Sequence, residues 1–191
     1  MTETRFKELG RTAMEALAAG ELDAGSRAVG LDLPDLFVSE RARWLWRYRL
    51  TQMAADPEGA AWCVRQVLVG VDVRVDAGVD VGVEDSGGQG TREAVVGHAG
   101  FHGPPDKAGM VEIGYVTVPA YRRRGYARAA LTELLRRAAA DPSVSVVRAT
   151  VAPDNVASLA TLAPFGFTHV GEQWDEEDGR ELIYERPARA E

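Results

Sequence analysis

Hydrophobic and polar residues repeat with two different periods, and the change of period divides the chain. Up to about residue 60 the period is helical, and it predicts short helices over Thr12–Ala19 and Leu22–Ala28 and a longer one over Ser39–Ala55. Thr12 and Glu15 have the spacing of a capping box, and Ser39 stands at the N-cap position of the third helix. We therefore expect residues 1–60 to form N-terminal helices.

From Trp62 the alternation has a period of two, which is typical of strands. Valine at 67, 69, 71, 73 and 75 alternates with other residues, a turn follows at Asp76–Gly78, and valine at 79, 81 and 83 resumes the pattern. This predicts a hairpin arm over residues 67–92. Its bias toward valine, aspartate and glycine indicates an elaboration outside the core.

The remaining residues, 94–186, alternate between strand and helix patterns. The apolar run Val144–Val151 is nearly continuous, which predicts a strand buried on both faces. A helix between the strands at 111–118 and 144–151 predicts a βαβ crossover within a mixed α/β fold. The expected strands cover 94–101, 111–118, 144–151, 168–173 and 181–186, and the expected helices cover 125–140 and 155–163.

Composition limits the class of protein. A length of 191 residues suits one domain, or one domain with an appended arm. The net charge of -7 disfavours a nucleic-acid surface and favours cationic partners such as amines. Cys63 is the single cysteine, the first 20 residues are rich in charge, and no apolar run reaches the roughly 18 residues of a membrane span. We expect a soluble cytoplasmic protein without a membrane partner.

The turn before the helix at 125–140 has the features of an anion site. Backbone N–H groups at a helix start lack intrahelical partners, and the helix dipole adds positive charge there. Gly125 permits a backbone conformation that a side chain would obstruct. Arginines at 122, 123, 124 and 128 add full charges. The alternative is an ordinary turn that carries a solvated arginine run.

Two motifs resemble the GNAT superfamily of N-acetyltransferases. The segment Val118–Leu131 is similar to its acetyl-CoA signature, Gln/Arg-x-x-Gly-x-Gly/Ala. Asn155-x-x-Ser158 followed by Gly166-Phe167 resembles the RimJ/RimL-like branch, as do Gly97–Phe101 and Glu112–Tyr115. The similarity extends from about Trp62 to Arg186 with the arm set aside.

The resemblance implies a single acetyltransferase domain over 1–191, whose CoA-binding core is 94–186. Its mixed, mostly antiparallel sheet, flanked by helices, would splay where acetyl-CoA binds, and no metal is implied. Asn155 would hold the pantetheine arm; a plain helix N-cap is the alternative, and the two roles are compatible. Pantetheine would pair with the backbone of Val116, Thr117 and Val118, and the pyrophosphate would bind N–H groups of Arg123, Arg124, Gly125, Tyr126, Ala127 and Arg128.

The catalytic candidates are Glu112 and Ser158. An alkyl ammonium must lose a proton before it attacks a thioester, and Glu112 is the candidate base. Glu112 is about 13 Å from Val116 along an ideal strand, so bridging water would be needed. The alternative is a carboxylate satisfied by arginine or solvent. The resemblance makes Ser158 the donor to the departing thiolate; many relatives use a helix tyrosine where this chain has Leu162.

Other reactive residue types are less informative. His98 and His102 share a strand face, but spacing implies no acidic partner, so solvated or core histidines are favoured over a groove role. Three histidines and one cysteine do not make a metal site. Tryptophans 44 and 46 and Tyr48 suit a core or a groove wall. Cys63 has no activating neighbour, which disfavours an acyl-cysteine route.

These observations predict an acetyl-CoA-dependent N-acetyltransferase that acts by direct attack of a primary amine. The acceptor is left open between a protein N-terminus and a small-molecule amine. A CoA-sensing or interaction module with weak or no catalysis is the alternative, motivated by the missing helix tyrosine. No nucleic-acid partner is expected, and a homodimer is left open.

Overall fold

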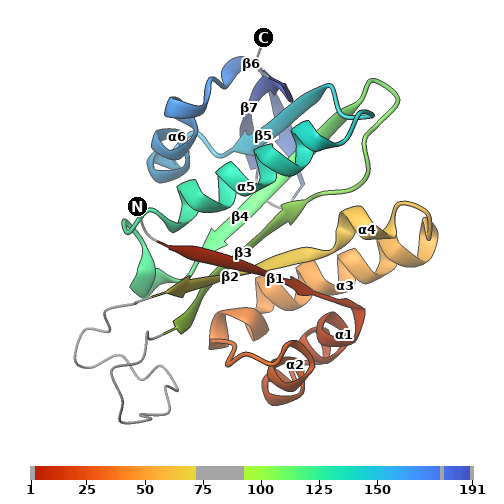
Figure 1. Ribbon diagram of the computed structural model, residues 1–191. Helices are drawn as coiled ribbons and strands as arrows, with labels where there is room; N and C mark the ends of the chain where they lie inside the picture. The colour runs from red at the N-terminus through yellow and green to blue at the C-terminus, as the bar shows by residue number, and fades with distance from the viewer. Residues whose placement is uncertain (1–2, 72–92, 177–178, 190–191) are drawn as a thin grey trace.

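A sheet runs through the whole molecule. The computed structural model describes residues 3–71, 93–176 and 179–189. Within them the sheet has seven strands in the order β1-β2-β3-β4-β5-β7-β6 (Figure 1). The strands are β1 Thr4–Leu9, β2 Arg65–Val71, β3 Glu93–Phe101, β4 Met110–Thr117, β5 Val146–Val151, β6 Thr168–Asp175 and β7 Gly179–Pro187.

The sheet is mixed and mostly antiparallel. β4 and β5 are parallel neighbours, whereas the other described neighbours are antiparallel. The α-helix α5, Tyr126–Ala140, connects β4 to β5. The predicted crossover and fold class are therefore confirmed.

Helices cover the two faces of the sheet differently. α5 packs against β2, β3 and β4, and α6, Val156–Leu162, lies on the same face (Figure 1). The N-terminal helices pack on the opposite face, over the β1–β3 half. They are α1 Arg11–Ala19, α2 Leu22–Val29, α3 Glu40–Ala55 and α4 Ala60–Cys63; short 3-10 turns are η1 Asp35–Val38, η2 Pro119–Tyr121 and η3 Ala163–Phe165.

Each face has its own hydrophobic core. One core joins α5 and α6 to the sheet through Leu131, Leu134 and Leu162, which are almost fully buried. The other packs Phe37 and Trp46 against the opposite face. Burial of these apolar side chains is the main favourable contribution to folding, about 25 cal/mol per Å² removed from water.

The N-terminal region is not purely helical, because β1 precedes the helices. Thr4–Leu9 lies at the edge of the sheet and only Leu9 is buried, so the strand lacks the apolar alternation that would have revealed it. The predicted capping box is wrong: Gly10 is the N-cap of α1 and Thr12 already lies inside the helix. β1 ends at Leu9, so the chain enters the helix directly through Gly10. Ser39, in contrast, caps α3 as predicted, accepting from the Ala42 N–H at 3.3 Å.

Two strand predictions also change. Residues 67–71, expected to start the arm, belong to β2, which lies inside the sheet between β1 and β3. Residues 72–92 of the predicted arm lie outside the described residues. β5 is buried on one face only, with Val147, Ala149 and Val151 inside and the alternate residues half-buried. The expectation of two buried faces is therefore wrong. On the Arg148 and Thr150 face, the described N-terminal helices lie over the β1–β3 half of the sheet and do not extend to β5.

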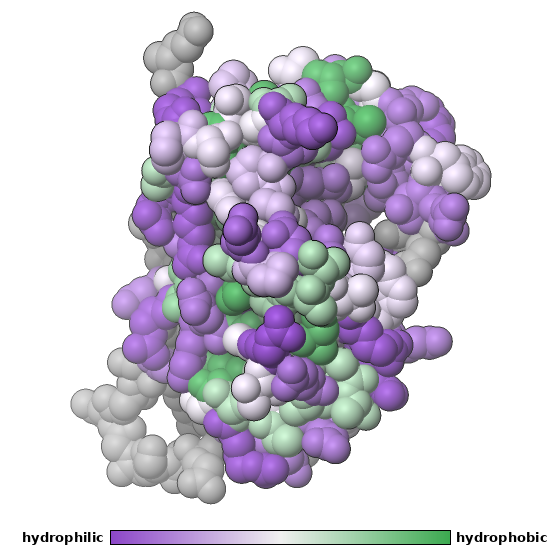
Figure 2. All heavy atoms as spheres, turned by 90° about the vertical axis from the view of Figure 1, so that its right-hand side faces the viewer, coloured by the Kyte–Doolittle hydropathy of each residue, from purple (hydrophilic) through white to green (hydrophobic). Residues whose placement is uncertain are grey.

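The described residues on one side of the molecule form a surface of mixed polarity (Figure 2). The side of the molecule in Figure 2 mixes hydrophilic residues with small hydrophobic patches. Among the described helices, none combines the length and the apolar character needed to cross a bilayer.

Candidate active site

The parallel strands β4 and β5 separate part-way along their length. Their pairing runs from Met110↔Val146 to Glu112↔Arg148 and ends there, although both strands continue. Beyond this point β4 remains paired with β3 on its other side, through Thr117. Among the described strands, none pairs with the other backbone edge of residues 113–117, and this opening is called the fork below.

A left-handed turn connects β4 to α5. Arg123 has φ 61° and Gly125 has φ 90°, a region that L side chains rarely adopt and glycine adopts easily. Successive N–H groups in such a turn can form an anion-binding nest. The first intrahelical bond of α5 runs from the Ala129 N–H to the Gly125 carbonyl at 3.0 Å, so the N–H groups of residues 126–128 have no partner within the helix.

Two buried aromatic residues pack beneath the backbone of this turn, on its core side. Tyr121 and Tyr126 are buried and meet edge to face, with ring centroids 6.4 Å apart. The Arg124 guanidinium lies 5.7 Å from the Tyr121 ring centroid, in cation–π geometry. Arg122, Arg123 and Arg128 are exposed. The turn is therefore packed against two buried tyrosines and carries three exposed arginines.

The start of α6 carries two more of the predicted residues. Asn155 is the N-cap, and its Oδ1 accepts from the Ser158 N–H at 3.1 Å. The Tyr115 hydroxyl of β4 is buried beside the hydroxyls of Ser158 and Thr161; burial raises its pKa and these two neighbours act to lower it. A tyrosine of β4 thus lies beside Ser158, although Leu162 occupies the α6 position at which many relatives have a tyrosine.

Glu112 lies at the closed end of the fork, and its carboxylate has two close neighbours. Its Oε1 accepts from the Thr150 hydroxyl at 2.7 Å and lies 3.2 Å from His102 Nδ1. Burial acts to raise the pKa of Glu112, but His102, Thr150 and the charge of Arg148 outweigh it, so the pKa is lowered. The carboxylate is therefore ionised at neutral pH.

His102 departs from the sequence interpretation, which found no acidic partner for it. Its partner is Glu112, ten positions away in sequence but opposite it across the β3–β4 pair, where the His102 N–H donates to the Glu112 carbonyl at 2.8 Å. His98 is a core histidine as favoured, packed edge to face against Phe37 and Trp46. Antiparallel pairing of the two predicted strands could have brought His102 beside Glu112, but that prediction would have needed the register of one strand against the other.

Two buried arginines beneath the fork were not predicted. Arg65 of β2 donates to the carbonyls of Gly100 at 3.2 Å and Gly114 at 2.9 Å. Arg49 of α3 donates to Gln52 and to the His102 carbonyl. Both side chains are almost fully buried. Burial, followed by the charges of Arg65 and Arg49, lowers the pKa of His98 well below its ordinary range.

The aromatic and cysteine candidates differ in burial. Trp46 is buried and donates to the Phe37 carbonyl at 2.7 Å, whereas Trp44 and Tyr48 stack on each other at the surface. Cys63 is buried, and burial raises the pKa of its thiol. Within the described ranges, no group of three or more His, Cys, Asp or Glu residues is arranged to hold a metal ion.

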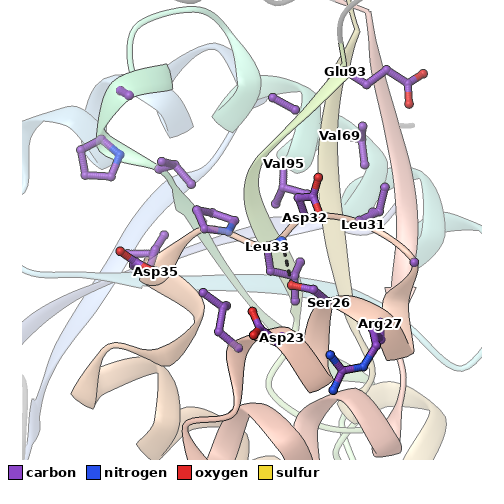
Figure 3. Close-up of a pocket in the computed structure, with 18 residues that line it drawn as sticks. Asp23, Ser26, Arg27, Leu31, Asp32, Leu33, Asp35, Val69, Glu93 and Val95 are labelled. Atoms are coloured by element: carbon purple, nitrogen blue, oxygen red, sulfur yellow. Dashed lines mark hydrogen bonds between the residues drawn. The ribbon is translucent and has the colours of Figure 1, made fainter. Parts of the chain in front are cut away.

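A cavity of about 1040 Å³ lies at the far end of β4 from Glu112. Its walls come from α2, the segment 30–36, the ends of β2 and β3, and residues 118–120 at the start of the turn (Figure 3). Figure 3 shows Asp23, Asp32, Asp35 and Glu93 around it, with the Leu33 N–H bonded to the Ser26 hydroxyl at 3.1 Å. It adjoins the turn but does not contain Glu112 or Ser158.

Residues 27–168 match the sequence model of the acetyltransferase (GNAT) domain. The chain belongs to the GNAT acetyltransferase family. It is 41% identical over 73 residues to the uncharacterized N-acetyltransferase YjdG of Bacillus subtilis; that match covers 38% of this chain and 44% of that protein, less than half its length.

Solved GNAT structures show the same fold. The ribosomal-protein alpha-N-acetyltransferase RimL, solved with coenzyme A, matches with a TM-score of 0.60 and 15% identity, covering 98% of this chain and 95% of that one. A chimera of the spermidine N-acetyltransferase SpeG of Vibrio cholerae matches with a TM-score of 0.59 and 13% identity, covering 98% and 96%. At this identity the likeness establishes the fold, and the RimJ/RimL-like branch stays a proposal.

Proposed function

We propose that this GNAT protein transfers an acetyl group from acetyl-CoA to a primary amine by direct attack, and that the chain works as one acetyltransferase domain. The observation that carries the proposal is the fork, where β4 leaves β5 beside an ionised Glu112 and ends in the left-handed turn. Acetyl-CoA supplies an activated acyl group; the remaining chemistry belongs to side chains and backbone groups of this chain.

The donor half of the site fits acetyl-CoA. We expect pantetheine amides to pair with the backbone around Val116, Thr117 and Val118, along the edge of β4 that faces the fork; the Val118 N–H itself already donates to the Val96 carbonyl at 2.8 Å. The turn and the first N–H groups of α5, over residues 123–128, suit a pyrophosphate. Asn155 at the start of α6 would hold the pantetheine arm with its amide while its oxygen caps the helix.

The reaction half requires proton removal from the amine and proton supply to sulfur. Glu112 would supply the negative charge that draws the proton away, and its side chain lies on the face of the sheet opposite α5, where the Thr150 hydroxyl donates to it. Ser158, beside the buried Tyr115 hydroxyl, would donate to the thiolate. A backbone N–H near residues 116–118 would polarise the carbonyl. The single cysteine, Cys63, is buried with a raised thiol pKa, which is unfavourable for an acyl-cysteine intermediate.

Free-thiol release from acetyl-CoA tests the proposal against a panel of amines that includes a peptide N-terminus, a polyamine and an aminoglycoside. We expect turnover with at least one amine, and Glu112→Gln should lower that turnover at neutral pH while CoA binding, measured by calorimetry, survives. Tight CoA binding without turnover on any amine would instead favour the CoA-binding module. Unchanged turnover in Glu112→Gln would remove Glu112 from the mechanism.

A further inference from the structure

His102 and Glu112 form a dyad on the face of the sheet opposite α5. Their backbones pair across β3 and β4, so both side chains project to the same face, and Nδ1 lies 3.2 Å from Oε1. The Thr150 hydroxyl donates to the same oxygen at 2.7 Å, which holds the carboxylate in place from β5. Three strands thus position the pair, and the imidazole is the more exposed member, at 43% against 22% for the carboxylate.

The carboxylate determines which imidazole nitrogen is free. An ionised carboxylate only accepts hydrogen bonds, so Nδ1 of His102 must carry the hydrogen that points to Glu112. Nε2 then has an available lone pair. This is the arrangement in which a carboxylate orients a histidine so that its other nitrogen can take up a proton.

Nε2 lies where Glu112 itself does not reach. A Cβ added at Gly114 would come within 2.6 Å of Nε2, so the nitrogen lies directly over this glycine, and only a residue without a side chain leaves room for it. Gly114 is about 7 Å from Val116 along a strand, whereas Glu112 is about 13 Å away. The imidazole therefore bridges about half of the distance that Glu112 would otherwise have to cover through water.

We propose that His102 is the catalytic base and that Glu112 is the residue that positions it. This rests on the proposed function. As the amine nitrogen bonds to the acetyl carbon, its proton passes to Nε2 of His102. The carbon–sulfur bond breaks with its electron pair on sulfur, and the thiolate takes a proton from solvent directly or through Ser158, whose hydroxyl regains its proton from solvent. The imidazolium then returns its proton to solvent. The products are the acetylated amine and free CoA.

Groups on all neighbouring elements define the charge around His102. Arg65 of β2 and Arg49 of α3 bond to backbone carbonyls, including that of His102, and the Arg65 guanidinium lies on the same face as the imidazole, near Gly114. Arg148 of β5 is paired with Glu185 of β7. On β3 itself, Nδ1 of the buried His98 lies 3.3 Å from the Arg65 guanidinium. Of His98 in β3 and His102 just beyond its end, only His102 has a carboxylate next to its ring among the described residues.

The kinetic test uses His102→Gln, Glu112→Gln and the double variant, with His169→Gln as a control on β6. A positioned general base contributes about 10²- to 10⁴-fold, so we expect kcat/KM to fall at least about 100-fold in His102→Gln and about tenfold in Glu112→Gln. The double variant should lose no more than His102→Gln, because the pair acts as one unit. The low-pH limb of the kcat/KM profile should disappear in His102→Gln, and His169→Gln should match the wild type.

A second measurement needs no turnover. Long-range ¹H–¹⁵N spectra of the untagged protein without CoA should show His102 as the Nδ1–H form, and Glu112→Gln should abolish that preference. Nε2–H as the dominant form would overturn the dyad. So would a His102→Gln variant that keeps wild-type kcat/KM while Glu112→Gln loses 100-fold, because Glu112 would then act alone. If the wild type acetylates no amine, the proposed function fails, and the tautomer alone decides whether the pair exists.

Discussion

Gly125→Ala tests whether the left-handed turn is the CoA cradle. Gly125 has φ 90°, and an L residue in the left-handed region costs about 1–2 kcal/mol. For a chain of this size that corresponds to a fall in Tm of about 2–8 °C. Relief of the strain would rotate the N–H groups that face the proposed pyrophosphate, so the Kd for CoA should rise at least about tenfold, or about 1.4 kcal/mol.

Gly20→Ala is a matched control for this change. Gly20 has φ 91° at the C-terminus of α1, and a Cβ there would meet the Arg43 side chain at 3.4 Å, an ordinary contact. The two variants should lose similar stability in thermal denaturation followed by circular dichroism. Only Gly125→Ala should lose CoA affinity in calorimetry. Equal CoA affinity in the two variants, despite equal loss of stability, would refute the assignment of the turn.

Three further predictions concern His98, Asn155 and Cys63. Folded His98 stays neutral because burial and two arginines lower its pKa, whereas the unfolded chain binds a proton near pH 6.5; stability should therefore fall as pH drops below about 6.5, by up to about 1.4 kcal/mol per pH unit. Urea unfolding at pH 7 and 5.5 should show that His98→Gln lacks this contribution to the pH dependence. The same change in unfolding free energy between the two pH values in the wild type and in His98→Gln would contradict the prediction. Asn155→Ala should lower the free energy of unfolding by about 0.5–2 kcal/mol because the helix cap is lost. Asn155→Asp keeps the capping acceptor, so it should lose CoA affinity without losing stability. Full CoA affinity of Asn155→Asp in calorimetry would show that Asn155 is only a cap. The buried Cys63 thiol, with its raised pKa, should react with a disulfide reagent only after unfolding, and immediate reaction in the native protein would contradict its burial.

The sequence by itself determined the features that depend on neighbouring residues. The Ser39 and Asn155 caps, the glycine turn at 125 and the helix after it each depend on hydrogen bonds or dihedral angles within a few positions. Their residue types therefore point to one local geometry. That was enough to predict the crossover and an anion cradle, and the resemblance then named the donor.

Only the tertiary structure decided what surrounds Glu112. The meeting of His102 with Glu112 depends on the register of β3 against β4, which many weak side-chain contacts determine together. The parallel ladder ends at Glu112↔Arg148, and Thr150, two residues further along β5, donates to the Glu112 carboxylate. Arg65 is buried because backbone carbonyls of two other strands accept its hydrogen bonds, and no spacing along one strand indicates that. The reacting groups come from separate strands, so their arrangement exists only once the sheet has formed.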